Sequence, residues 1–250
     1  VDDDECMSVK SIVESVQRLV GLMQQSKWLQ ECFEILDVPL MCGAPDKSKQ
    51  ANLNESSSGS LGCNRDSASV WRIVCLGVGL VGSSSNARWQ TAFALCLQKR
   101  YAHGTMSPFV EPLLRQQERE ALSALGFKVE TITDNLDVAQ HGDSGFGTLL
   151  YMPHCPAALY HNELRRQWTS AQQLSKTAII GNSFAKYCLR LPAGAAPLIL
   201  KCEPFTIEVS LPNTLEGAEE AFNDTALHVF DQTKMEDSFK PLSETDVEIT

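Results

Sequence analysis

The chain contains no run of apolar residues that approaches the ~20 needed to cross a membrane. It also shows no secretory signal with a charged start and an apolar core. Its nine cysteines are scattered and odd in number, and no two have the Cys-x-x-Cys spacing. These absences argue against a membrane span, a disulfide framework and a structural zinc site. They favour reduced thiols in a cytoplasmic or nuclear protein.

A basic stripe interleaved with aromatic residues is missing as well. Residues 70–202 hold thirteen basic and eight acidic side chains, without the pattern that predicts contact with nucleic acid. Residues 203–250 hold twelve acidic and two basic side chains, so the C-terminal fifth carries the net charge of −10. We interpret the acidic ends of the chain as solvated segments.

What is present indicates one domain with extensions, since 250 residues with 43% hydrophobic content suffice for one core. Apolar residues recur at helical spacing from Val9 to Leu36, with a break at Gly21 or Ser26 and an end at Pro39 to Gly43. We expect this helical extension to pack on the domain. The predicted division is a helical extension over 1–42, a disordered linker over 43–69, an α/β domain over 70–230 and a disordered acidic tail over 231–250.

From residue 70 onward, short apolar runs alternate with helical segments. Strands are expected at 70–76, 107–112, 127–132, 148–152, 177–180, 197–203, 205–209 and just before 230. This alternation predicts a doubly wound, mostly parallel, Rossmann-like α/β sheet.

The first expected strand runs into Gly77-x-Gly79-x-x-Gly82, which matches the dinucleotide fingerprint. Glycines allow the backbone to approach a phosphate, and the N-terminus of the following helix favours an anion. Ser84 and Ser85 lengthen the turn before that helix. Glu111 comes about 32 residues after Gly79, where an acid would meet a ribose.

Two later strands also end in polar residues. His154 and Cys155 follow one strand, and a lone His-Cys pair is more often structural, because cysteine is usually buried. However, the carboxyl ends of parallel strands lie at one edge of a sheet and line one crevice. We therefore predict a ligand site composed of Gly77, Gly79, Ser84, Ser85, Glu111, His154, Cys155, Asn182 and Ser183.

The residues alone leave three functions open: a ligand-sensing regulatory domain, a transferase of the methyltransferase type and a scaffold without a ligand. A Cys/His hydrolase is disfavoured because no Asp or Asn is evidently placed to orient His154. No metal site is predicted, because His154, Cys155 and His161 lack a fourth ligand at a familiar spacing.

Five blocks in order between residues 70 and 230 resemble the SRR-like (sensitivity to red light reduced) domain family. They are Cys75-Leu-Gly-Val-Gly79 with Ser84, Ser85, Ala87, Arg88 and Gln90; Glu111-Pro112 with Glu118, Leu122 and Leu125-Gly126; Tyr151-Met-Pro-His-Cys-Pro156 with Leu159-Tyr160; Gly181-Asn-Ser-Phe184; and Phe222-Asn-Asp-Thr225. Glu111 departs from the pattern, which has Asp at this place.

The resemblance implies a regulatory protein with protein partners rather than an enzyme, and it carries over no catalytic residue. It implies roles in the circadian clock and in the regulation of haem biosynthesis. The expected ligand of the crevice is a small anionic or nucleotide-like molecule. Cys155-Pro156 has the form of a haem-regulatory motif, so haem ligation by the Cys155 thiolate is a further hypothesis.

Overall fold

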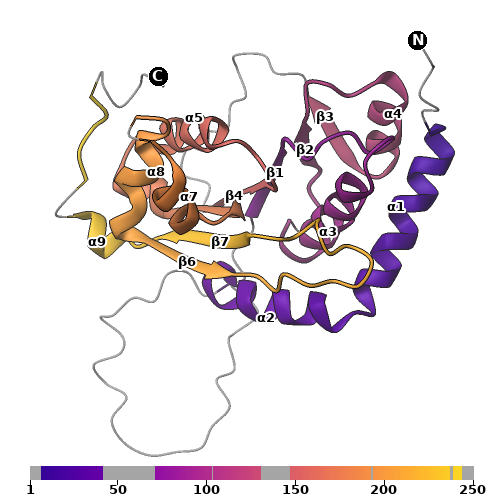
Figure 1. Ribbon diagram of the computed structural model, residues 1–250, viewed down its shortest axis with the longest axis horizontal. Helices are drawn as coiled ribbons and strands as arrows, with labels where there is room; N and C mark the ends of the chain where they lie inside the picture. The colour runs from indigo at the N-terminus through magenta and orange to yellow at the C-terminus, as the bar shows by residue number, and fades with distance from the viewer. Residues whose placement is uncertain are drawn as a thin grey trace, which may run out of the picture.

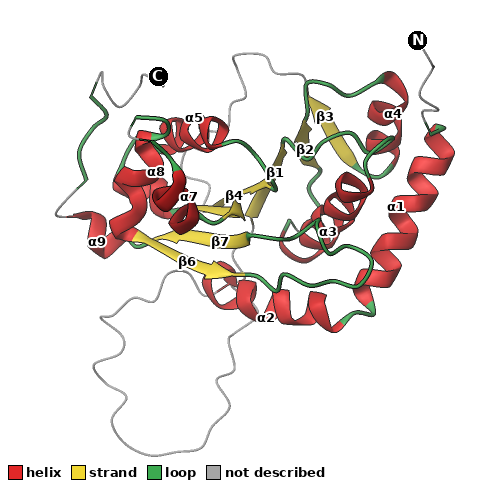
Figure 2. Cartoon of the chain, viewed as in Figure 1, coloured by secondary structure: helices red, strands yellow, loops and turns green. Residues whose placement is uncertain are grey.

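The computed structural model describes residues 7–41, 71–102, 104–130, 147–192, 194–236 and 239–243. Seven strands form one sheet in the order β3-β2-β1-β4-β5-β7-β6, with helices on both faces (Figures 1 and 2). The predicted doubly wound, mostly parallel sheet is confirmed. No helix among the described residues is long and apolar enough to cross a membrane.

Six of the described strands point in the same direction, and only β7 runs against them. Five of the six form the parallel part of the sheet: β1 (Trp71–Leu76), β2 (Ser107–Val110), β3 (Phe127–Glu130), β4 (Gly147–Met152) and β5 (Thr177–Asn182). β7 (Thr225–Phe230) runs antiparallel to β5, and β6 (Thr206–Ser210) runs antiparallel to β7.

Successive residues of a central strand enter opposite layers of the core, as the pleat of a strand requires. Ile73 and Cys75 pack in the layer that contains α1, α2 and α3, whereas Val74 and Leu76 pack in the layer that contains α5 and α8. Because β1 is covered on both faces, its sequence is a continuous apolar run. The helices after β1 are α3 (Ser85–Tyr101), α4 (Gln116–Ala124), α5 (Ala157–Gln167), α6 (Ala171–Ser175), α7 (Phe184–Arg190), α8 (Pro197–Cys202) and α9 (Gln232–Glu236).

The N-terminal extension forms two helices, α1 (Val9–Gln24) and α2 (Lys27–Met41), which separate near the expected break at Ser26. Both contribute buried residues to the α3 layer of the core, so the packing prediction is confirmed. The second helix ends at Met41, within the expected range from Pro39 to Gly43, and Pro39 lies in its last turn. The proline removes one N–H donor there, while Leu36 and Leu40 remain fully buried on either side of it.

Two other expectations were wrong. Residues 197–202 form helix α8 rather than a strand, with Pro197 in its first turn and Leu198, Ile199 and Cys202 buried. That spacing places the three apolar side chains on one helix face. The chain also continues beyond residue 231 as α9, and Phe239 stacks on Trp168.

Met235 in α9 is fully buried, so the apolar residues of this stretch extend the core. The expected linker at 43–69 lies outside the described residues, as do 1–6, 131–146 and 244–250.

Candidate functional site

The register of the sheet brings the carboxyl ends of four parallel strands level with one another. Leu76 of β1 pairs with Val110 of β2, and Met152 of β4 pairs with Gly181 of β5. The polar residues that follow these strands therefore lie along one edge, as predicted. In an open α/β sheet, this is the edge at which ligands bind.

The turn after β1 has a backbone that only glycine adopts readily. Gly77 and Gly79 have φ angles of 60° and 96°, in the region that side chains with a Cβ disfavour. A Cβ atom at Gly77 would lie 2.8 Å from the Cys155 sulfur. The Gly77 N–H donates to the carbonyl of Val110 at 3.0 Å, which ties this turn to the end of β2.

Two buried glutamates each accept one N–H group of this glycine turn. Glu111, directly after β2, accepts from Gly79 N at 3.1 Å through one oxygen, and its other oxygen accepts from Leu113 N at 3.2 Å. Glu118 of α4 accepts from Gly82 N at 2.7 Å. The expected phosphate cradle is thus already filled by two carboxylates of the chain itself.

The two serines of the glycine turn lie at the start of α3. Ser84 is the N-cap, and its hydroxyl accepts from Ala87 N at 3.1 Å. Ser85 is the first residue of the helix and is exposed. An N-cap serine satisfies a helix donor that would otherwise lack an intrahelical partner, so Ser84 has a structural task in addition to any contact with a ligand.

His154 is exposed and has an unusual backbone. Its φ angle is 53°, which is uncommon for a residue other than glycine. Its backbone N–H donates to Asn182 Oδ1 at 2.9 Å, and its ring Nε2 lies 3.3 Å from the carbonyl oxygen of Asn223. The expected proximity to Asn182 is thus present through the backbone, while the hydrogen bonds of the ring lead to Asn223 rather than to Ser84.

A network of side chains beneath His154 fixes this turn. Asn182 Nδ2 donates to Tyr187 Oη at 2.8 Å and to the carbonyl of Cys155 at 3.3 Å. Tyr187 Oη donates to the same carbonyl at 2.7 Å. Tyr160 Oη accepts from Asn182 N at 2.8 Å and donates to the carbonyl of Met152.

Cys155 is buried beneath the glycine turn, with its thiol 3.3 Å from the carbonyl of Leu76. Burial, with smaller contributions from Glu111 and Glu163, raises the pKa of this thiol to about 12. A thiolate that ligates haem must be deprotonated and open to the ligand, and Cys155 is neither. The hypothesis of haem ligation at Cys155 therefore does not fit the structure.

Ser183 is the N-cap of α7, and its hydroxyl also contacts the edge strand β6. Its hydroxyl accepts from Lys186 N at 3.1 Å and donates to Glu208 of β6. Partial burial acts to raise the pKa of Glu208, but hydrogen bonds from His228, Ser183 and the Ala185 N–H lower it to about 2. Ser183 therefore supports the position of α7, and its hydroxyl is already engaged.

Comparison with known proteins assigns the chain to a family. The model of the SRR1 domain matches residues 36–229. The chain belongs to the SRR1 domain family. The match begins inside α2. The sequence pattern predicts a later start for the domain, at residue 70.

Three curated relatives share parts of the SRR1 domain. The SRR1-like protein of Mus musculus is 40% identical over 119 residues, which are 47% of this chain and 46% of the mouse protein. Protein SENSITIVITY TO RED LIGHT REDUCED 1 of Arabidopsis thaliana is 28% identical over 64% of this chain and 58% of its own length. The SRR1-like protein of Drosophila melanogaster is 30% identical over 66% of this chain and 56% of its own length. The chain thus spans about half the length of the curated relatives it matches.

Two solved structures also align with the SRR1 domain. A crystal structure of a mutant of MtNAS aligns with a TM-score of 0.36 and 15% identity, and it covers 89% of this chain and 70% of its own. The bifunctional kinase-methyltransferase WbdD aligns with a TM-score of 0.35 and 14% identity, and it covers 66% of this chain and 35% of its own.

Most of the predicted site residues of the SRR1 domain are joined by direct contacts. Glu111 meets Gly79, Cys155 lies against Gly77, and Asn182 bonds the backbone of both Cys155 and His154.

Sequence reasoning missed Glu118, Tyr160, Tyr187 and Asn223. The signal for Glu118 was its place in the second family block, and for Asn223 it was the Asn-Asp turn before the last strand. Among the described residues, no group of three or more His, Cys, Asp or Glu side chains could hold a metal ion.

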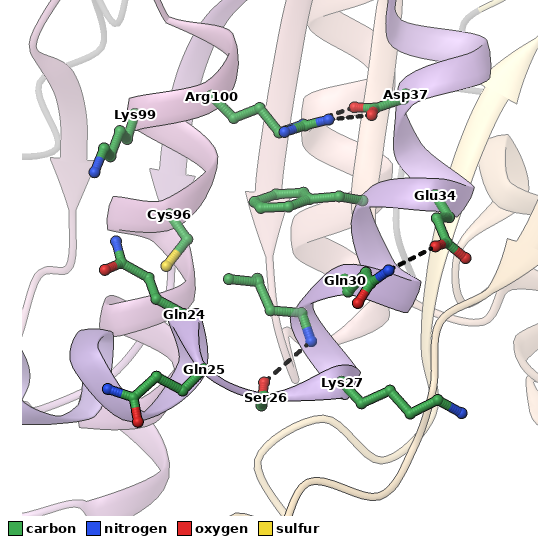
Figure 3. Close-up of a pocket in the computed structure, with 12 residues that line it drawn as sticks. Gln24, Gln25, Ser26, Lys27, Gln30, Glu34, Asp37, Cys96, Lys99 and Arg100 are labelled. Atoms are coloured by element: carbon green, nitrogen blue, oxygen red, sulfur yellow. Dashed lines mark hydrogen bonds and ion pairs between the residues drawn. The ribbon is translucent and has the colours of Figure 1, made fainter.

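A hollow lies away from the sheet edge, between the α1–α2 junction and α3 (Figure 3). Its volume is about 790 Å³. The ion pair between Arg100 and Asp37 closes one end, and the Arg100 guanidinium lies 4.5 Å from the centre of the Phe33 ring. Lys99 and Glu34 on its walls have opposite charges, so the hollow has no marked preference for an anion or a cation.

Proposed function

We propose that this SRR1 domain is a regulatory module that binds a nucleoside-type ligand at the carboxyl edge of β1, β2 and β4. The observation that carries the proposal is the placement of the Glu111 carboxylate at the end of β2 against the glycine turn. A carboxylate has about four lone-pair positions, and the N–H groups of Gly79 and Leu113 use one on each oxygen. Two positions remain for the hydroxyl groups of a ribose.

The charge of this edge indicates which nucleoside it would take. Glu111 and Glu118 hold the N–H groups of Gly79 and Gly82, which a phosphate would need. Both carboxylates are buried, so they would also repel an anion in a region of low dielectric. We therefore narrow the expected ligand to a nucleoside with a neutral or cationic 5′ substituent, of which S-adenosylmethionine is the natural probe.

The regulatory part of the proposal rests on the family. The name of the Arabidopsis relative refers to sensitivity to red light, and the resemblance implies roles in the circadian clock and in the regulation of haem biosynthesis. We propose that nucleoside binding sets the affinity of the domain for its protein partners. A regulatory role toward haem biosynthesis would not require haem to bind Cys155.

Isothermal titration calorimetry tests the proposal. We expect S-adenosylmethionine and S-adenosylhomocysteine to bind, and ADP-ribose to bind more weakly because of its phosphates. Glu111→Gln should weaken both adenosyl ligands by about 10- to 100-fold, because hydrogen bonds to a charged acceptor are lost. Glu120→Gln is the control, since Glu120 is an exposed residue of α4 whose carboxylate bonds Gln116. Equal affinity in wild type and Glu111→Gln, or no nucleoside binding at all, would refute the proposal.

Methyl transfer is a second candidate function, favoured by the order of the strands. In this order the glycine turn follows β1, the acid Glu111 follows β2 and the Pro-flanked pair His154-Cys155 follows β4, a layout that suits a transferase of this type. Because one fold supports many activities, the decisive measurement is turnover of S-adenosylmethionine in the presence of a candidate acceptor.

A further inference from the structure

His154 differs from the other described histidines in the exposure and the hydrogen bonds of its ring. His228 is buried, with Nδ1 3.2 Å from the carbonyl of Ile179 and Nε2 3.3 Å from the backbone N of Phe184. His161 is also buried, and its Nδ1 accepts from Leu198 N. His154 is exposed at the ligand edge of the sheet, and the one described partner of its ring is the carbonyl of Asn223.

That partner fixes the tautomer of the neutral ring. A carbonyl oxygen can only accept a hydrogen bond, so the Nε2 atom that meets Asn223 must carry the hydrogen. Nδ1 is then left with a lone pair, and no described residue donates to it. The ring is therefore oriented as a proton acceptor by a backbone group, much as a catalytic histidine is oriented by a hydrogen bond to its other nitrogen.

The backbone of His154 is held in a left-handed conformation that residues other than glycine seldom adopt. A left-handed conformation at a residue other than glycine persists when the surrounding structure determines it. Here Asn182 Oδ1 holds the N–H of His154, and Asn182 itself is held by Tyr187 and Tyr160. This support acts on the backbone and fixes the point from which the imidazole projects.

We propose that Nδ1 of His154 is the proton-accepting group that faces the 5′ substituent of the bound nucleoside. This inference rests on the nucleoside site proposed above. Glu111 follows β2 and His154 follows β4, with β1 between them, so the two lie about 10 Å apart at ordinary strand spacing. A ribose held by Glu111 would place its 5′ substituent across β1 toward His154. Neutral His154 would accept a hydrogen bond from this substituent, and protonated His154 would repel it if it is cationic.

Titratable groups on the elements around His154 either have partners of their own or keep one charge state near neutral pH. On the turn before β7 and on α7, Asp224 and Lys186 form an ion pair with each other. Burial raises the pKa of Tyr187 in α7, so its phenol stays neutral. Glu208 of β6, with its pKa of about 2, stays ionised. An ordinary histidine changes charge between about pH 5.5 and 8.

The test compares a sulfonium with the matching thioether. We expect the affinity of S-adenosylmethionine, relative to that of S-adenosylhomocysteine, to fall about five- to tenfold from pH 8 to pH 5.5 in wild type. The ratio should not depend on pH in His154→Asn. Asparagine tolerates the left-handed backbone and keeps the N–H that bonds Asn182, and an unchanged melting temperature would show that the variant folds.

A second readout needs no ligand. Nitrogen-15 NMR of the imidazoles, with the His154 signal assigned by His154→Asn, should show the neutral Nε2–H tautomer. The Nδ1–H tautomer, or an affinity ratio that does not change with pH, would overturn this inference and leave the nucleoside site standing. Absence of binding by both nucleosides would overturn the two proposals together.

Discussion

At the scale of single residues, one Cβ atom decides whether the glycine turn can form. Gly77→Ala would place a methyl group 2.8 Å from the Cys155 sulfur at a φ of +60°, and we expect it to destabilise the fold by about 1–3 kcal/mol. Gly21→Ala is the matched control, because that site in α1 has no atom within 4 Å and alanine favours a helix by about 0.5–1 kcal/mol. Urea unfolding should show opposite signs for the two variants, and equal effects would contradict the geometry.

Glu208 gives a prediction about acid stability. Its pKa is lowered from 4.5 to about 2 in the folded chain, so its contribution to stability is full above pH 4.5 and is lost as the pH falls toward 2. Glu208→Gln should remove this part of the pH dependence of the unfolding free energy. Urea unfolding from pH 7 to pH 2 measures it, with exposed Glu220→Gln as the control. An unchanged slope in Glu208→Gln would show that the carboxylate is not engaged.

How far the sequence predicts the site depends on the kind of contact. Glu111, His154 and Asn182 could be found because each is a polar residue directly after a buried strand. Glu118 stands out in the sequence only through its place in the second family block, and its contact with Gly82 depends on where α4 docks. The Asn-Asp turn marks the position of Asn223, but Asn223 meets His154 through its backbone carbonyl, so the contact itself does not depend on the asparagine side chain.

At the scale of elements, α1 and α2 are part of the core layer on the α3 side of the sheet. The Trp28 ring lies 4.5 Å from the Phe222 ring and 5.1 Å from the Phe93 ring, and its Nε1–H donates to the carbonyl of Pro212 at 2.7 Å. The helix pair thereby holds the β6–β7 connection, which leads to Asn223, against α3. Docking of the N-terminal helices and the position of Asn223 at the carboxyl edge of the sheet are thus linked.

Trp28→Ala tests this docking. We expect a loss of about 3–5 kcal/mol, typical of a buried tryptophan reduced to alanine. Trp28→Phe should lose less, because it keeps a ring against Phe222 and gives up only the hydrogen bond to Pro212. Val38→Ala in the same helix removes an exposed side chain and should change the free energy of unfolding little. A Trp28→Ala variant as stable as wild type would mean that α2 packs only loosely on α3.

Element prediction succeeded where a segment is long or sits between clear turn signals. The strands at 71–76 and 147–152 fit their predicted places to within a residue or two, because both are apolar runs bounded by glycine or proline. The run at 197–202 was misassigned because a short apolar stretch fits a strand and a helix equally well. Tertiary packing selects the helix, because Leu198 and Ile199 both pack in the α5–α8 layer of the core.

At the scale of the whole molecule, the sheet lies between two layers of the core, one on each face. Cys32 of α2 and Cys75 of β1 lie in the layer on the α3 side, and Cys202 of α8 lies in the layer on the α5 side. All three are fully buried, and burial raises the pKa of each thiol, to about 12 for Cys202. A protonated, enclosed thiol does not react until the structure around it opens, so each cysteine reports the opening of its own layer.

Native-state labelling with iodoacetamide, read by mass spectrometry, should therefore show one common slow rate for Cys32, Cys75 and Cys202. The reason is that neither helical layer can leave without exposing the apolar sheet, which makes opening a single cooperative event. Cys188, only partly buried, should react faster and serves as the internal control. If Cys32 reacted more than tenfold faster than Cys75, then α1 and α2 would open separately from the sheet. The N-terminal helices would then unfold independently of the sheet, and the proposed nucleoside binding would not depend on them.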